Sequence, residues 1–109
     1  MPTRTARTAW SGSLSEGSGD VELVSSGLAT FHVSFPKRAA DDADGTTSPE
    51  ELIGAALSSC YSMQLSALLE QAGGTPRTLD VTADVSFGPD PAGGFHLSLI
   101  HISEPTRPY

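Results

Sequence analysis

The first third of the chain alternates hydrophobic and polar residues in short runs. Residues 20–25 and 30–35 both alternate in this way, which predicts two antiparallel strands joined through Ser26 and Gly27. Residues 5–10 form a short Thr-rich run that is compatible with a further strand. Pro36 is expected to end the strand at 30–35, because proline has no backbone N–H to donate to a sheet.

The only long helical pattern runs from Ser48 to Gly74. Ser48 is a favourable N-cap, Pro49 suits the first helical position, and Glu51 stands three residues after the cap and completes a capping box. Gly73 and Gly74 predict where the helix ends. The first four turns are hydrophobic nearly all round, so the helix is expected to be buried between layers.

A second pair of strands follows the helix. Residues 77–87 alternate throughout, and residues 95–102 begin another strand after the turn-forming segment 88–94, so the two are expected to pair as a hairpin. Strands, a long helix and a further hairpin predict an α+β fold. Residues 103–109 have no core pattern and are expected to be disordered.

Length and charge restrict the classes of partner. The 109 residues predict one domain, and thirteen acidic against six basic side chains give a formal net charge of −7. This charge disfavours nucleic acid and anionic membrane surfaces, which are themselves negative. No segment is expected to reach the roughly 20 apolar residues of a membrane span, and the N-terminal segment is expected to be neither a signal peptide nor an anchor. A hydrophobic share of 38% gives a small core for so long a helix, so a partner chain is expected.

The chain has one cysteine, Cys60, near the middle of the predicted helix. One thiol cannot form an internal disulfide, which fits a reducing cytoplasm or a thiol kept for its reactivity. A buried helical thiol is more often an inert hydrophobic group than a nucleophile. Cys60 also lies about three turns into the helix, too far for the helix dipole to activate it. A reactive Cys60 therefore needs a cation from another element.

Three segments of the chain form a recognisable combination. They are A-W-S-G-S-L-S-E-G-S-G at 9–19, F-P-K-R at 35–38, and T-S-P-E-E-L-I-G-A-A-L-S-S-C-Y-S-M at 47–63. Together they resemble the OsmC/Ohr family of osmotically inducible and organic-hydroperoxide-resistance proteins. The resemblance covers about residues 6–97, and the third segment is its most specific part.

The resemblance implies an intertwined α+β homodimer with active sites at the subunit interface, and a thiol peroxidase acting on organic hydroperoxides and, more weakly, hydrogen peroxide. Cys60 then corresponds to the peroxidatic cysteine, Arg38 to the activating arginine, and Glu51 to the carboxylate that orients it. A second cysteine captures the sulfenic acid as a disulfide, which an external dithiol reduces.

The spacing of these residues limits the geometry of such a site. Glu51 and Cys60 are nine residues apart, which is about 13 Å along a straight helix and about half a turn out of phase. They cannot touch within one unbroken helix. Either Arg38 bridges them, or Glu51 of the partner subunit completes the site.

The C-terminal part departs from the family pattern, because the resolving cysteine and the helix that carries it do not occur in these 109 residues. The end S-L-I-H-I-S-E-P-T-R-P-Y looks like a translated sequencing adapter, and the alternative is a real strand with a short tail. Residues 1–97 are therefore expected to be the N-terminal part of one OsmC-like domain, and residues 98–109 a non-native or disordered tail. Such a chain is expected to be oxidised once and to turn over poorly.

No cofactor and no metal are expected. His32, His96 and His101 have no ligand spacing, and the acidic segment 39–47 matches a calcium loop only in part. The alternative function is a non-catalytic fragment or dimerisation module in which Cys60 is a structural residue.

Overall fold

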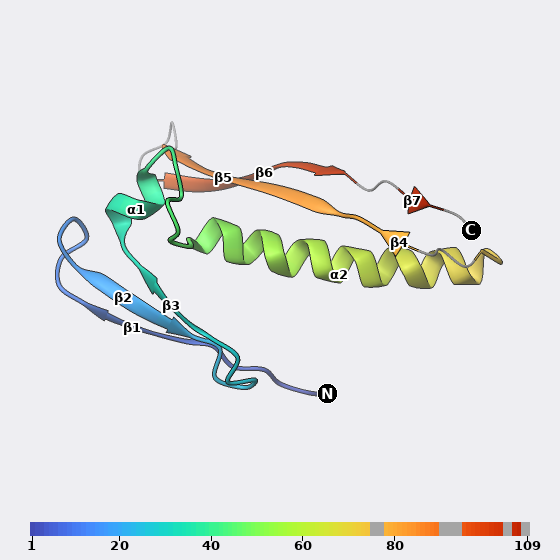
Figure 1. The fold of residues 1–109 in the computed structure, drawn as a ribbon, viewed down its shortest axis with the longest axis horizontal. Coiled ribbons are helices and arrows are strands. Elements are labelled where there is room, and N and C mark those ends of the chain that lie inside the picture. The colour runs from blue at the N-terminus through green and yellow to red at the C-terminus, as the bar shows by residue number, and fades with distance from the viewer. Residues whose placement is uncertain (75–77, 90–94, 104–105, 108–109) are drawn as a thin grey trace. The chain divides into compact units, whose positions relative to one another are not determined.

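The computed structural model describes residues 1–74, 78–89, 95–103 and 106–107, in two compact units, Met1–Pro49 and Glu50–Tyr109 (Figure 1). The first unit holds a three-stranded antiparallel sheet and a short helix, and the second holds a long helix and a β-hairpin. The predicted α+β class is confirmed.

The sheet of the first unit contains β1 (Arg7–Ser11), β2 (Ser18–Glu22) and β3 (Thr30–Val33), in that order. Both pairs are antiparallel, which confirms the predicted pairing of the second and third strands. Gly27 lies in the connection between them with φ 67°, a backbone conformation that favours glycine.

A short helix, α1 (Phe35–Ala39), follows β3 and was not predicted from the sequence. The Ser34 side chain caps it by accepting a hydrogen bond from the Lys37 N–H at 3.4 Å. Pro36 occupies the first turn, where a missing N–H leaves no helical bond unmade. Pro36 therefore does end the strand, but it does so by starting a helix that carries Arg38 in its last turn.

The long helix, α2 (Pro49–Gln71), begins and ends where its capping residues predict. Gly73 has φ 89°. The backbone N–H groups of Gly73 and Gly74 donate to the carbonyl oxygens of Glu70 and Leu69 at 3.0 and 2.9 Å. These two bonds form a Schellman motif, which ends the helix by satisfying carbonyl groups of its last turn.

The predicted hairpin is present as β5 (Thr82–Pro89) and β6 (Phe95–Ser103), which pair in antiparallel register. Most of the predicted turn, residues 90–94, lies outside the described residues. The register shifts between Asp84 and Val85, a local irregularity of the kind that bends a strand.

The strand predicted at residues 77–87 is not one continuous strand. It begins with β4 (Thr78–Leu79), is interrupted at Asp80 and Val81, and resumes as β5, whereas Arg77 lies outside the described residues. β4 pairs with β7 (Thr106–Arg107). The described part of segment 98–109 is therefore paired rather than irregular, while the division of the chain into a domain 1–97 and a non-native tail stays a prediction.

The expectation that α2 is buried between layers is wrong for the single chain. Its only buried residues are Glu50 and Gly54. Gly54 lies against β5, since a Cβ added there would be 3.2 Å from the Ala83 carbonyl oxygen and 3.7 Å from Val85 Cγ2. The large hydrophobic side chains that stay exposed on this helix are Leu57 (36%), Met63 (73%) and Leu68 (50%).

The statement that no segment is long and apolar enough for a membrane span also needs correction. α2 has 23 residues and includes an 18-residue window of mean hydropathy 1.4, so by length and composition it qualifies. A core helix that is hydrophobic all round meets the same criteria. Length and composition alone therefore do not make α2 a membrane span.

Candidate functional site

Cys60 is exposed on α2. Residues three or four positions apart lie on one helix face, which places Cys60 in a stripe with Ala56, Met63 and Ala67. All four side chains are exposed in the chain. Gly54, which contacts β5, lies on the other side of the helix, so the hairpin leaves the thiol accessible.

The serine hydroxyl groups near Cys60 are directed at the helix backbone. Ser58 Oγ donates to the Ala55 carbonyl at 3.2 Å, and Ser62 Oγ donates to the Ser58 carbonyl at 2.8 Å. Ser59 makes the same kind of bond. No lysine, arginine or histidine occurs between residues 49 and 71. A cation that activates the thiol must therefore come from outside α2.

Arg38, the predicted activating residue, lies in the last turn of α1 and is half-buried. Its backbone N–H donates to the Ser34 carbonyl at 3.0 Å. The neighbouring cation, Lys37, is more exposed and forms an ion pair with Asp44 at 3.4 Å. The two cations of α1 thus differ in surroundings, and Arg38 is the one that lines a pocket.

The predicted carboxylate, Glu51, is exposed in the first turn of α2, whereas its neighbour Glu50 is 8% exposed. Because α2 is unbroken from Pro49 to Gln71, Glu51 and Cys60 do not meet within one chain, as their spacing predicts. Arg38 belongs to the first unit and Glu51 and Cys60 to the second. Sequence reasoning missed the burial of Glu50, because both acids stand at the positive end of the helix and no pattern distinguishes them.

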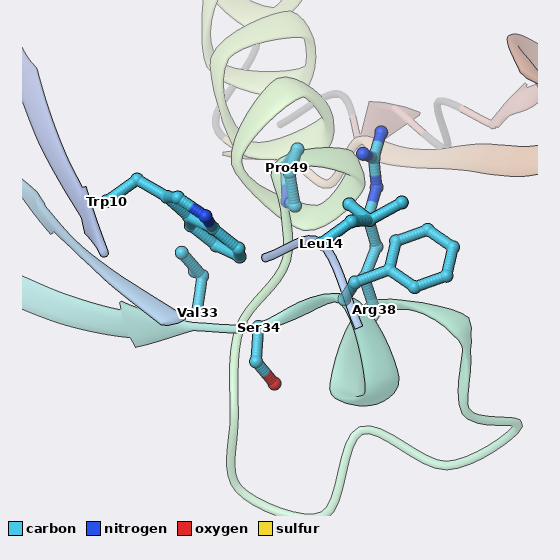
Figure 2. Close-up of a pocket in the computed structure, with 7 residues that line it drawn as sticks. Trp10, Leu14, Val33, Ser34, Arg38 and Pro49 are labelled. Carbon is cyan, nitrogen blue, oxygen red and sulfur yellow. The ribbon is translucent and has the colours of Figure 1, made fainter. Parts of the chain in front are cut away.

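A pocket of about 230 Å³ lies within the first unit (Figure 2). Its walls are almost entirely apolar, and Ser34, its only hydroxyl residue, directs its side chain to the α1 cap instead. Figure 2 shows the Trp10 ring and Val33 on one side and Leu14 on the other. The residues that line the pocket are Trp10, Leu14, Val33, Ser34, Phe35, Arg38 and Pro49.

The acidic segment before α2 has no arrangement of metal ligands. Asp42 and Asp44, from the partial calcium-loop match, are exposed, and Asp44 pairs with Lys37. In the part of the chain that the structure describes, no group of three or more His, Cys, Asp or Glu side chains is placed to hold a metal ion.

An α+β fold whose long helix presents a single exposed thiol, preceded by an arginine on a short helix, defines the class of protein. The chain belongs to the OsmC family, since residues 40–106 match the family described as OsmC-like protein. The resemblance inferred from the three sequence segments is thereby confirmed.

Individual relatives agree with this assignment. The chain is 43% identical over 84 residues to Peroxiredoxin OsmC of Escherichia coli (strain K12) and to that of Shigella flexneri, covering 77% of this chain and 57% of each relative. It therefore spans little more than half the length of these curated relatives. It also matches the crystal structure of an organic hydroperoxide resistance protein from Elizabethkingia anophelis with crystallant-derived thiocyanate bound. That match has a TM-score of 0.71 at 28% identity and covers 96% of this chain and 71% of the other.

Proposed function

We propose that this chain reduces organic hydroperoxides with Cys60 as the attacking thiol. The observation that carries the proposal is the exposed Cys60 within the segment that matches OsmC-like proteins. Two relatives are named Peroxiredoxin OsmC, and a structural neighbour is an organic hydroperoxide resistance protein. Both names support a peroxidase-type role.

The proposed reaction oxidises sulfur and reduces oxygen. The Cys60 thiolate attacks the terminal oxygen of the hydroperoxide, and the O–O bond breaks. The sulfur becomes a sulfenic acid, and the alkoxide that leaves takes a proton to form the alcohol. A thiol then displaces water from the sulfenic acid to give a mixed disulfide, and a second thiol releases Cys60 in its reduced form.

Arg38 is the proposed activating cation, because a guanidinium beside a thiol favours the thiolate. It is half-buried and lines the pocket of the first unit. A carboxylate from the first turn of α2 is proposed to orient the guanidinium, which bidentate pairing would do with a fixed geometry. The sequence pattern favours Glu51 for this role, and the low exposure of Glu50, 8%, makes Glu50 the second candidate.

A homodimer is the proposed working form. The stripe of Ala56, Cys60, Met63 and Ala67 is exposed in a single chain, and covering it by a second copy would remove apolar surface from water. Such a partner also removes the spacing problem, because Glu51 of the partner subunit is not bound by the distance along one helix.

The 109 residues contain one cysteine, so the proposed disulfide must form with a thiol outside them. We expect the sulfenic acid to form once per chain and turnover to depend on an added dithiol. The need for a reduced thiol makes a reducing cytoplasm the proposed compartment.

Selective labelling tests the proposal. The folded wild-type chain is treated with one equivalent of cumene hydroperoxide at pH 6, followed by a sulfenic-acid reagent and mass spectrometry. We expect a single label on Cys60, none in Cys60→Ser, and a rate of peroxide consumption at least tenfold lower in Arg38→Ala. Labelling or alkylation that requires unfolding would instead favour the alternative function, a non-catalytic dimerisation module. The small and apolar residues exposed around Cys60 support this alternative.

A further inference from the structure

Met63 lies one helical turn after Cys60, on the same face of α2. Its side chain is 73% exposed, and residues three positions apart on a helix have Cβ atoms about 5–6 Å apart. The other methionine of the chain, Met1, belongs to the other compact unit. A hydroperoxide that approaches the thiol of Cys60 therefore meets an exposed thioether sulfur beside it.

The surroundings of Met63 on α2 are uncharged. Between Glu51 and Glu70 the helix has no charged side chain. Reduced Met63 is apolar and pliable, so it suits burial against a second copy of this face. Oxidation converts the thioether to a polar sulfoxide, which disrupts interfaces that contain methionine. The same side chain therefore has opposite effects on association before and after oxidation.

We propose that Met63 is a peroxide-sensitive modification site, and that its oxidation to the sulfoxide prevents this face of α2 from pairing with a second copy. The proposal rests on the homodimer described under the proposed function. The thioether sulfur attacks the terminal oxygen of the hydroperoxide, and the O–O bond breaks. The departing alkoxide takes the proton from the new S–OH group and leaves as the alcohol. The sulfur gains one oxygen and loses two electrons, and a methionine sulfoxide reductase with a dithiol restores it.

Association and oxidation of Met63 oppose each other. The single chain presents Met63 to solvent, whereas a second copy would cover it. Oxidation therefore takes place on separated chains, and an oxidised chain can pair again only by removing a sulfoxide oxygen from water, which is costly. Excess peroxide thus converts dimers to monomers by mass action.

The first test compares the two methionines in Cys60→Ala, which removes the chemistry of the thiol. The variant is treated with cumene hydroperoxide over a range of protein concentrations, and peptide mass spectrometry measures the addition of one oxygen to each methionine. Met1 is fully exposed and serves as the internal reference. We expect similar rates for the two residues where sedimentation finds single chains. Where it finds dimers, we expect Met63 to react at least about tenfold more slowly than Met1, because association protects it. A ratio that does not change with protein concentration overturns the proposal.

The second test asks whether the sulfoxide controls association. Met63→Leu, made in the same Cys60→Ala background, keeps a similar apolar volume but cannot be oxidised. After peroxide treatment, Met1 is oxidised in both proteins. We expect self-association of the chain with Met63 to weaken at least about tenfold, since a sulfoxide must be desolvated, and that of the leucine variant to stay unchanged. A Cys60→Ala chain that is monomeric before peroxide is added, or that stays dimeric with Met63 oxidised, overturns the proposal.

Wild-type protein separates this inference from the proposed function. Oxidation of Met63 that dissociates the dimer, without a sulfenic-acid label on Cys60, supports the modification site and overturns the peroxidase proposal. A labelled Cys60 together with oxidation of Met63 that leaves association unchanged overturns the modification site alone.

Discussion

Two adjacent carboxylates begin α2 in different surroundings. Glu50 is 8% exposed and Glu51 is exposed, although both stand in the first turn, where negative charge is favourable. Burying a carboxylate is costly unless it is paired or hydrogen-bonded. Loss of the charge should therefore change the free energy of unfolding more at Glu50 than at Glu51.

Parallel substitutions of the two acids separate structural from catalytic roles. We expect Glu50→Gln to lower the free energy of unfolding by about 1–2 kcal/mol, because it removes a negative charge that lies buried at the positive end of α2. Glu51→Gln should change it by less than about 0.5 kcal/mol, as at other exposed positions. Urea unfolding measures both.

Activity of the same two variants identifies the carboxylate that orients Arg38. The variant lacking that group should reduce peroxide consumption by about 10²-fold, since a misplaced catalytic group is penalised on that scale. A loss confined to Glu51→Gln supports the residue chosen from the sequence. A loss confined to Glu50→Gln assigns the role to the buried acid, and no loss in either removes the carboxylate from the proposed mechanism.

At the scale of elements, the sequence predicted correctly the helix ends and strands that depend on local backbone preferences. α2 begins directly after Ser48 and ends just before Gly73, as these residues predict, and alternation predicted the β5–β6 hairpin. α1 was missed because its five residues are too few to show a hydrophobic period, and because Pro36 stops a strand and starts a helix equally well. Since α1 carries Arg38, the sequence selected this candidate residue without predicting the element that carries it.

The end of α2 provides a matched test of backbone conformation. Gly73 has φ 89°, so Gly73→Ala should cost about 1–2 kcal/mol, the penalty of a left-handed conformation for a residue with a Cβ. Gly74 is not in that conformation, and a Cβ there would lie 3.4 Å from the Leu69 carbonyl oxygen, an ordinary contact. Gly74→Ala should therefore change stability by less than about 0.5 kcal/mol. Equal losses in urea unfolding would show that the left-handed conformation does not determine this helix end.

For the whole molecule, the sequence predicted the composition of α2 correctly but not its burial. A helix that is hydrophobic nearly all round implies cover on every side, and among the described residues of the second unit β5 covers α2 at Gly54. For the candidate site, too, the sequence predicts residue types but not their surroundings. Cys60, Arg38 and Glu51 were chosen by residue type and family pattern, but a sequence holds no signal for which chain contributes which side chain to a site. The sequence pattern therefore selects candidate residues, and in the proposed homodimer the distances between them would depend on how the two chains associate.

The face of α2 that carries Cys60 gives a test at this scale. Met63 is 73% exposed in the chain, and a second copy covering the stripe of Ala56, Cys60, Met63 and Ala67 would bury it. Sedimentation velocity should then find wild-type protein at twice the chain mass of 11.3 kDa. Met63→Glu should shift it to the monomer, because the variant must desolvate a charge on association. Gln64→Glu is the control, since it adds the same charge at the next position, which is already polar and exposed, and it should remain dimeric.

A folded wild-type chain that sediments at 11.3 kDa would contradict the dimer and would leave Cys60 exposed, as it is in the single chain. In that case the peroxidase proposal would depend on activation of Cys60 by Arg38 of the same chain.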